Sequence, residues 1–291
     1  MPILTSNIII KFRLLGVLML CIASTSCSSF FFQPHKQLYR DPAKVGLAFE
    51  DVYFPTTDGL TLHGWFLPAQ GKAQGTVLFL HGNAENISTH IGSVYWLPAR
   101  GFNVFLPDYR GYGKSHGTPS LDGSVDDIES ALRYVLGNKT VDAHRVVVFA
   151  QSLGGSLSTY AIANSPNQKN IRALIIDSAF ADYRGIAQEK LADFWLTWPI
   201  QWPLSFIVDN RYSPIKFINK INGLQTLFIH GDADKVVPVH HGRALYEAAN
   251  TPKDLWIVPT GQHIDSMQRE EYQDKLVEYM LRNLGDTQKQ N

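Results

Sequence analysis

The stretch RVVVFAQSLGGSLSTYAIAN, residues 145–164, joins a run of β-branched and aromatic residues directly to a helix-like stretch. Short, nearly continuous apolar runs are typical of strands that are buried on both faces of a sheet. One serine, Ser152, is surrounded by the small residues Ala150, Gly154 and Gly155. A chain that passes so sharply from strand to helix presses the positions around the turn against neighbouring backbone, so only small side chains fit there. The stretch therefore predicts a strand, a tight turn at Ser152 and a helix.

Similar apolar runs recur along the chain and alternate with helix-like stretches. This alternation predicts an α/β fold with a mostly parallel sheet and helices on both faces. Residues 49–69, FEDVYFPTTDGLTLHGWFLPA, differ in that two alternating runs flank TTDG, which predicts a β-hairpin. The apolar runs are TVLFLHG (76–82), NVFLPD (103–108), ALIID (173–177), TLFIHG (226–231) and LWIVP (255–259), and the helix-like stretches are 121–138, 240–250 and 271–285.

The composition indicates a globular protein that does not bind nucleic acid. Of the 291 residues, 45% are hydrophobic and 18% are charged, which is enough apolar material for one large domain. Without residues 1–26, which hold two basic residues and no acid, 24 basic residues face 26 acidic ones, a net charge of −2. No basic field favours nucleic acid as a partner. Because Cys21 and Cys27 are the two cysteines, the folded part has no disulfide, thiol nucleophile or cysteine metal site, and we expect no metal and no cofactor.

The N-terminus, MPILTSNIIIKFRLLGVLMLCIASTSC, has the pattern of an export signal. Lys11 and Arg13 precede the apolar run 14–23, which is too short to span a bilayer comfortably. Small residues and then Cys27 resemble a bacterial lipoprotein signal, although Ser24 stands where that signal usually has an aliphatic residue. We expect residues 1–26 to be a signal peptide and Cys27 to be acylated, which would make the protein an exported, membrane-anchored lipoprotein. Ordinary cleavage and an uncleaved anchor are the alternatives.

Two further segments define the expected domain organisation. Residues 27–46 show no periodicity and contain two prolines, which is typical of a tether or of an arm lying on the domain. Residues 47–291 then form the α/β domain, interrupted at about 181–213 by an aromatic-rich helical insertion. This insertion is either additional core packing or a lid whose aromatics line an apolar pocket, since both have the same composition. Its tryptophans are Trp195, Trp198 and Trp202.

The turn at Ser152 has two interpretations. AQSLG, residues 150–154, matches the nucleophile elbow G-x-S-x-G with alanine in the first place. In such an elbow the serine hydroxyl is exposed at the carboxyl edge of the sheet and lies at the positive end of the following helix. An ordinary serine N-cap would also place serine before a helix.

The rest of the chain offers partners for a nucleophilic serine. A serine hydroxyl needs a histidine to take its proton, and the histidine needs a carboxylate to orient it. LFIHGDADKVVP (227–238) supplies an acid after one buried strand, and LWIVPTGQHIDSM (255–267) supplies a histidine after the next. The order serine, acid, histidine is typical of α/β hydrolases. We therefore assign Ser152 as nucleophile, Asp234 as acid and His263 as base.

Several nearby residues compete for these roles. Asp232 is the main rival acid, but an aspartate directly after Gly231 is expected to serve the turn through local hydrogen bonds. Asp265 follows the candidate histidine. His240 and His241 open a predicted helix and are more simply interpreted as exposed or capping residues.

Attack by a serine also requires two donors for the developing oxyanion. The backbone N–H of Leu153, directly after the nucleophile, is one. TVLFLHGNAEN (76–86) supplies the other after an earlier strand, where Gly82 allows the backbone to approach, and we assign the N–H of Asn83. Glycine and asparagine also favour a plain strand-ending turn.

As a set, these motifs resemble a known family. LFLHGNAEN, LPDYRGYGKSHGTPS, VVVFAQSLGG, LIIDSAF, LFIHGDADKVVP and TGQH resemble the serine α/β-hydrolases described as serine aminopeptidase-like, especially the branch with protein-depalmitoylating thioesterases. The resemblance runs from about Phe49 to Leu284. It implies an α/β-hydrolase fold whose eight-stranded sheet has an antiparallel second strand, and it gives the same triad and oxyanion positions. Ala150 departs from the usual glycine, and the cysteine cluster of the depalmitoylating branch is absent.

These features predict a serine hydrolase that cleaves ester or thioester bonds of a small or lipid-like acyl substrate through an acyl-enzyme. A serine aminopeptidase is the alternative that the family description suggests. Such an enzyme needs acids to hold a free amine, and the insertion offers mainly Glu189, Asp193 and Asp209. A surface lipoprotein that binds a partner without catalysis is a third hypothesis.

Overall fold

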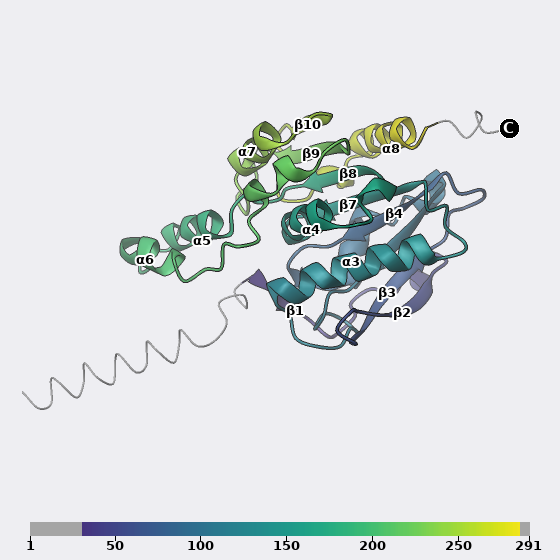
Figure 1. Cartoon of the computed structure of the whole chain (residues 1–291), viewed down its shortest axis with the longest axis horizontal. Coiled ribbons are helices and arrows are strands. Elements are labelled where there is room, and N and C mark those ends of the chain that lie inside the picture. Colours follow the sequence, from purple (N-terminus) through teal and green to yellow (C-terminus); the bar gives the residue numbers. More distant parts are fainter. Residues whose placement is uncertain (1–30, 286–291) are drawn as a thin grey trace, which may run out of the picture.

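The computed structural model describes residues 31–285, so the predicted signal at 1–26 and Cys27 lie outside the described residues. The chain forms a central sheet with helices on both sides (Figure 1). Its strands are β1 (Gln33–Pro34), β2 (Glu50–Pro55), β3 (Thr61–Leu67), β4 (Gly75–Leu80), β5 (Ala84–Glu85), β6 (Phe102–Pro107), β7 (Val146–Gln151), β8 (Ile171–Asp177), β9 (Gln225–Gly231) and β10 (Lys253–Val258). Its α-helices are α2 (Ile87–His90), α3 (Leu121–Gly137), α4 (Leu153–Asn164), α5 (Tyr183–Ala192), α6 (Gln201–Ser205), α7 (Val239–Ala248) and α8 (Glu270–Leu284).

The main sheet has eight strands in the order β10-β9-β8-β7-β4-β6-β3-β2. β3 pairs antiparallel with both of its neighbours, β2 and β6, and the other pairs are parallel. The predicted hairpin is therefore the β2–β3 pair, and the mostly parallel eight-stranded sheet with an antiparallel second strand is confirmed. β10, however, lies at the edge of the sheet and is half-buried along most of its length, whereas its apolar sequence predicted a fully buried strand.

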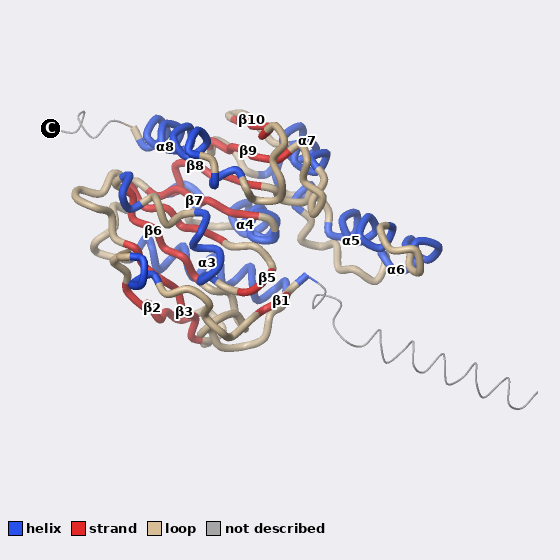
Figure 2. Tube along the Cα trace, turned by 180° about the vertical axis from the view of Figure 1, so that it is seen from behind, coloured by secondary structure: helices blue, strands red, loops and turns tan. Residues whose placement is uncertain are grey.

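Successive residues of the central strands enter opposite layers of the core. Leu78 and Leu80 of β4 pack in the layer that holds α3, α4 and α7, whereas Val77 and Phe79 pack in the layer that holds α8. The period of two along a strand produces this division. Both faces of the sheet are thus covered, which explains why the central strands have no polar side (Figure 2).

The described part of the expected tether, residues 31–46, packs against the domain. β1 pairs in parallel with β5 in a small two-stranded sheet, and Phe31 and Phe32 are buried. The segment expected as a tether therefore contributes side chains to the core at the carboxyl edge of the sheet.

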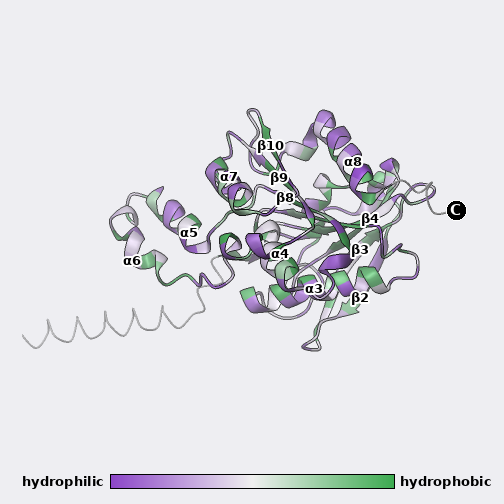
Figure 3. Cartoon of the chain, turned by 45° about the horizontal axis from the view of Figure 1, so that its top comes forward, coloured by the Kyte–Doolittle hydropathy of each residue, from purple (hydrophilic) through white to green (hydrophobic). Residues whose placement is uncertain are grey.

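The insertion between β8 and β9 carries α5 and α6 away from the body of the molecule (Figure 3). The predicted boundaries, 181–213, enclose both helices. Within residues 31–285, no helix is both long enough and apolar enough to cross a membrane.

Candidate active site

Ser152 lies in the turn between β7 and α4, at the carboxyl edge of the sheet. Its backbone is in the positive-φ region, with φ 52° and ψ −119°, where a side chain is strained. Its hydroxyl makes no capping hydrogen bond to α4, so the N-cap interpretation does not describe its side chain. A Cβ on Gly154 would lie 2.4 Å from the carbonyl oxygen of Leu80 and 2.5 Å from that of His81, which explains the glycine at this position.

The structure brings the three predicted triad residues together. Nε2 of His263 lies 2.9 Å from Oγ of Ser152, and Nδ1 of His263 lies 2.8 Å from Oδ2 of Asp234. Both separations are within hydrogen-bonding reach. These residues stand 82 and 29 positions apart in the sequence, and they meet because β7, β9 and β10 are parallel and end at the same edge.

Asp234 is held as an ionised acceptor. Burial favours its neutral form, but the hydrogen bond and the charge attraction from His263 outweigh burial and keep the pKa of Asp234 below its usual value. Its Oδ1 accepts hydrogen bonds from the backbone N–H groups of Val236 and Val237 at 2.8 and 2.9 Å. The carboxylate is thereby oriented with its other oxygen toward the imidazole.

The predicted oxyanion positions, Asn83 and Leu153, line the same cavity as Ser152. Leu153 opens α4, so its N–H belongs to the first helical turn, which has no intrahelical acceptor. The peptide that carries the N–H of Asn83 is fixed through its carbonyl, because Nδ1 of His81 donates to the oxygen of Gly82 at 2.7 Å. A Cβ on Gly82 would lie 3.5 Å from Cβ of Ser152, which shows how closely this loop approaches the serine.

Asp177 is a residue of the site that our sequence analysis did not identify. This buried carboxylate at the end of β8 accepts hydrogen bonds from Gln151, directly before the nucleophile, and from Ser266, three residues after the histidine, both at 2.9 Å. Ser178 donates to its other oxygen at 3.0 Å. Burial raises the pKa of Asp177. Asp177 thus connects the serine turn to the histidine loop. In the sequence, only its position at the end of an apolar run could have indicated this role.

The competing acids have other partners. Oδ1 of Asp232 accepts a hydrogen bond from the backbone N–H of Thr260 at 2.6 Å, so it binds the loop after β10, 28 positions away, and not its own turn as expected. Asp265 lies 3.7 Å from Arg269. Neither carboxylate is hydrogen-bonded to His263 within the described chain.

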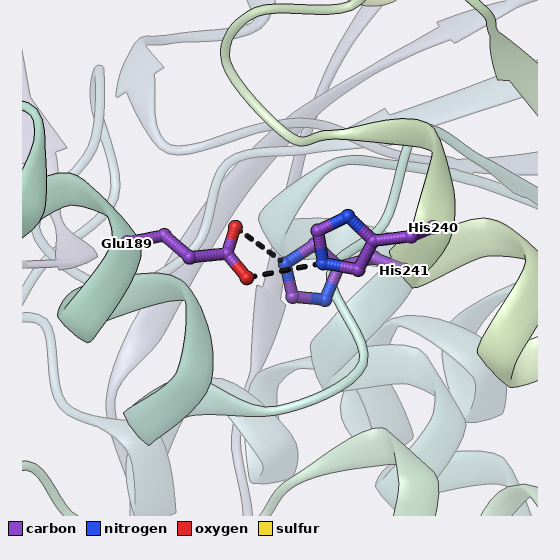
Figure 4. A group of neighbouring side chains, drawn as sticks. All are labelled: Glu189, His240 and His241. Atoms are coloured by element: carbon purple, nitrogen blue, oxygen red, sulfur yellow. Dashed lines mark hydrogen bonds and ion pairs between the residues drawn. The ribbon is translucent and has the colours of Figure 1, made fainter.

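His240 is exposed, as expected, but together with His241 it links α7 to the insertion. His241 is buried, and neither side chain caps α7. The Nε2 atoms of His240 and His241 donate to the two carboxylate oxygens of Glu189 on α5, at 3.0 and 3.2 Å (Figure 4). Burial lowers the pKa of His241.

The same three residues place their ligand atoms within 4.8 Å of one another, a spacing that suits a metal ion. However, Nδ1 of His241 accepts a hydrogen bond from the backbone N–H of Ala181, so its Nε2 carries the proton. A metal-binding histidine instead uses its outer N–H as a donor. The donor set therefore fits a hydrogen-bonded link between α5 and α7.

A cavity of about 490 Å³ opens at Ser152, Leu153 and Asn83. Its charged lining residue within the described chain is Lys190, and no acid lines it. The cavity is therefore suited to an apolar group attached to a reacting carbonyl. Its apolar wall is formed by Phe31, Phe180, Ile186, Ala187, Val236 and Val237.

Similar proteins share this fold and sequence pattern. The chain is 38% identical to YfhR, an uncharacterized protein of Escherichia coli O157:H7. The match spans 265 residues, 88% of this chain and 88% of YfhR. It is 33% identical to the alpha/beta hydrolase domain-containing protein WAV2 of Arabidopsis thaliana, over 77% of this chain and 75% of that protein.

Among solved structures, the Pyrococcus furiosus esterase Pf2001 superposes with a TM-score of 0.70 at 22% identity, covering 88% of this chain and 98% of that one. Acetyl xylan esterase 1 from Thermoanaerobacterium gives a TM-score of 0.64 at 21% identity, covering 87% and 89%. These two likenesses support the α/β-hydrolase fold. The model of the family described as serine aminopeptidase, S33, matches residues 71–217. The family model covers half of the chain, and relatives such as YfhR match most of its length. The chain therefore belongs to the serine aminopeptidase S33 family of α/β hydrolases.

Proposed function

We propose that this protein is a serine hydrolase that cleaves carboxylic ester or thioester bonds through an acyl-enzyme. The observation that carries the proposal is the position of His263, whose two ring nitrogens reach Ser152 and Asp234 at 2.9 and 2.8 Å. The esterases among the similar solved structures agree with this reaction class.

The proposed reaction begins with attack of Oγ of Ser152 on the substrate carbonyl. Nε2 of His263 takes the hydroxyl proton, and Asp234 stabilises the resulting imidazolium through Nδ1–H. The N–H groups of Leu153 and Asn83 hold the tetrahedral oxyanion. His263 then gives its proton to the leaving alcohol or thiol, and a water molecule activated by the same histidine releases the acid from Ser152.

The cavity supports an acyl group as the bound part of the substrate. Apolar side chains dominate its wall, and they begin directly beside the nucleophile. Burying one methylene contributes about 0.8 kcal/mol, so a longer acyl chain gains binding energy until it fills the space. A lipid-like acyl ester or thioester is therefore the substrate class that this site fits best.

The aminopeptidase alternative requires a carboxylate that receives the free amine of a peptide. Each of the four acids of the insertion already has a partner. Glu189 binds His240 and His241, Asp193 binds Lys190, and Asp209 binds Arg211. Asp182 accepts hydrogen bonds from Gly185 and Asn210. The described lining of the cavity carries a cation instead of an acid. These contacts disfavour binding of a free α-amine.

A comparison of substrates tests the proposal. We expect the full chain to hydrolyse p-nitrophenyl acyl esters of graded chain length and to leave proline p-nitroanilide uncleaved. Ser152→Ala should lower turnover of the ester by about 10⁴-fold or more with the fold retained. Retained ester turnover in that variant would refute the assignment, and faster cleavage of the anilide would favour the aminopeptidase. Binding without turnover of either substrate would favour the non-catalytic lipoprotein.

A further inference from the structure

The insertion carries an exposed apolar surface that neither the core nor the active site uses. Residues 194–207, FWLTWPIQWPLSFI, contain no charged residue. Eight of their large apolar side chains are exposed, with relative exposures between 47% and 74%. They are Phe194, Trp195, Leu196, Trp198, Ile200, Trp202, Phe206 and Ile207, and we call this set the insertion surface. Core packing does not account for these side chains.

The insertion surface follows the wall of the catalytic cavity along the chain. α5 carries Ile186, Ala187 and Lys190 in that wall, and its C-terminal end is joined to Phe194 through Asp193. α6 then packs back against α5, as the two helices lie side by side in Figures 1 and 2. An apolar molecule resting on the insertion surface would therefore lie on the same pair of helices whose α5 forms part of the cavity wall.

The described chain also begins at the foot of this insertion. The ring of Phe31 packs edge-on against Tyr183, the first residue of α5, with centroids 5.0 Å apart, and it contacts Phe180 as well. Cys27 stands four residues earlier in the sequence. Four residues span at most about 14 Å when fully extended. An attachment at Cys27 would therefore hold Phe31, which packs on the first residue of α5, within about 14 Å of its anchoring point.

The charges around the insertion indicate which apolar partner fits. Five basic and four acidic residues flank the uncharged run between residues 181 and 220, so the surroundings are nearly neutral. Tryptophan is the side chain that favours the boundary between lipid and water, because its ring is apolar and its indole N–H remains hydrated. A neutral rim with three exposed tryptophans suits the interface of a zwitterionic bilayer, where apolar contact supplies the binding energy and charge contributes little.

We propose that the insertion surface docks on the surface of a phospholipid bilayer and presents the catalytic cavity to it. The occupant is the membrane to which the N-terminal segment would attach the protein. Docking places the cavity entrance beside the acyl region of the bilayer, so that an acyl substrate reaches Ser152 without crossing water. This inference concerns binding, and its test needs no turnover, so its failure and the failure of the proposed function are distinguishable.

Fluorescence quenching by brominated lipid tests the docking directly. The full chain is reconstituted in phosphatidylcholine vesicles that contain phosphatidylcholine brominated near the headgroup end of the acyl chain. Three of the six tryptophans belong to the insertion surface, and Trp65 and Trp96 are buried in the domain. We expect about half of the tryptophan emission to be quenched, with little change at high salt because the contact is apolar.

Matched variants identify the side chains that are responsible for the quenching of tryptophan emission. Trp195→Phe, Trp198→Phe and Trp202→Phe together should remove the quenched component while the surface stays apolar. Leu196→Ser, Ile200→Ser and Ile207→Ser together keep the three tryptophans but weaken docking, and should reduce quenching at least several-fold. Tyr53→Ser with Tyr95→Ser removes exposed aromatics from other parts of the surface and should leave quenching unchanged.

Two outcomes would overturn the proposal. One is quenching in the wild type no greater than in the triple phenylalanine variant. The other is self-association through the insertion: sedimentation would then show a dimer, and the tryptophans of the insertion surface would be shielded from the brominated lipid. In that case a second copy of the chain, and not the bilayer, covers the insertion surface.

Discussion

The backbone N–H of Ser152 donates a hydrogen bond of 2.8 Å to the carbonyl oxygen of Asp177. This bond holds the strained turn of β7 against the end of β8, while the side chain of Asp177 binds Gln151 on one side and Ser266 on the other. One residue of a neighbouring strand therefore positions both the nucleophile turn and the loop that carries His263. The proposed catalytic geometry depends on a buried carboxylate that takes no part in the chemistry itself.

Replacement of Asp177 should affect both stability and turnover. Asp177→Ala leaves three buried donors without their acceptor, which costs about 1–3 kcal/mol for each unsatisfied group. We expect a lower denaturation midpoint and a reduced kcat with a smaller change in KM, because the cavity wall is untouched. Asp142→Ala, at an exposed loop position where the carboxylate accepts one hydrogen bond from the N–H of His144, is the control; it should change the midpoint far less and leave kcat unaltered. An unchanged kcat in a folded Asp177→Ala variant would show that Asp177 does not position the catalytic residues.

Two glycine substitutions test the tightness of the serine turn. Gly154→Ala places a Cβ within 2.4–2.5 Å of two backbone oxygens, so the loop carrying the oxyanion donor must shift. We expect a destabilisation of about 1–3 kcal/mol and a large loss of ester turnover. Gly137→Ala, at the end of α3 where a Cβ meets nothing within 4 Å, should instead stabilise by up to about 1 kcal/mol. Chemical denaturation of both variants checks the contrast, and equal effects would contradict it.

The link between Glu189 and the two histidines should hold the insertion to the body. Glu189→Ala removes both hydrogen bonds from α5 to α7. We expect faster proteolysis within residues 194–207, because α5 loses its attachment to α7. Asp193→Ala removes an exposed ion pair with Lys190 that lies within the insertion itself, and it serves as the control. Equal cleavage rates in the wild type and in Glu189→Ala would show that the link does not restrain the insertion.

Stability should fall as the pH drops below about 6.5. Burial lowers the pKa of four histidines below their usual value, so the unfolded chain binds protons in this range before the folded chain does, and the free energy of unfolding declines. The four are His81, His90, His230 and His241.

Three buried carboxyl groups, Asp108, Asp127 and Asp177, act in the opposite direction. Burial raises the pKa of each, that of Asp127 to about 6, so the folded chain binds these protons before the unfolded chain does. Their effect on the free energy of unfolding becomes more favourable as the pH falls toward the usual pKa of aspartate. Urea denaturation at several pH values measures the sum of these effects. A midpoint that stays flat or rises between pH 7 and pH 6 would contradict the dominance of the histidines.

The sequence was sufficient to predict the sheet and the convergence of Ser152, Asp234 and His263, for identifiable reasons. Central strands buried on both faces have nearly continuous apolar runs, which made β4, β7 and β8 recognisable. Because parallel strands end at one edge, the polar residues directly after these runs had to lie close together. Residue order along the chain then disfavoured Asp265, which follows His263, and the place of Asp232 directly after Gly231 favoured Asp234 over it.

Other features depend on contacts that no local pattern encodes. Glu189 and His240 are 51 positions apart, and nothing in the sequence joins the two segments. Asp177 looked like an ordinary strand end until its partners were known. Hydropathy could not show whether the tryptophans of the insertion face the core or the solvent, because aromatic composition is the same in both cases. The packing of Phe31 and Phe32 was likewise hidden in a segment without periodicity.

Covalent labelling of the nucleophile tests the central claim most directly. The full chain is treated with a fluorophosphonate, and the modified residue is identified by mass spectrometry of its peptides. We expect one adduct, on Ser152, which is absent in Ser152→Ala and strongly slowed in His263→Ala because the serine then lacks its base. A folded protein that gives no adduct, or that is modified at another residue, would contradict the assignment of Ser152 as an activated nucleophile.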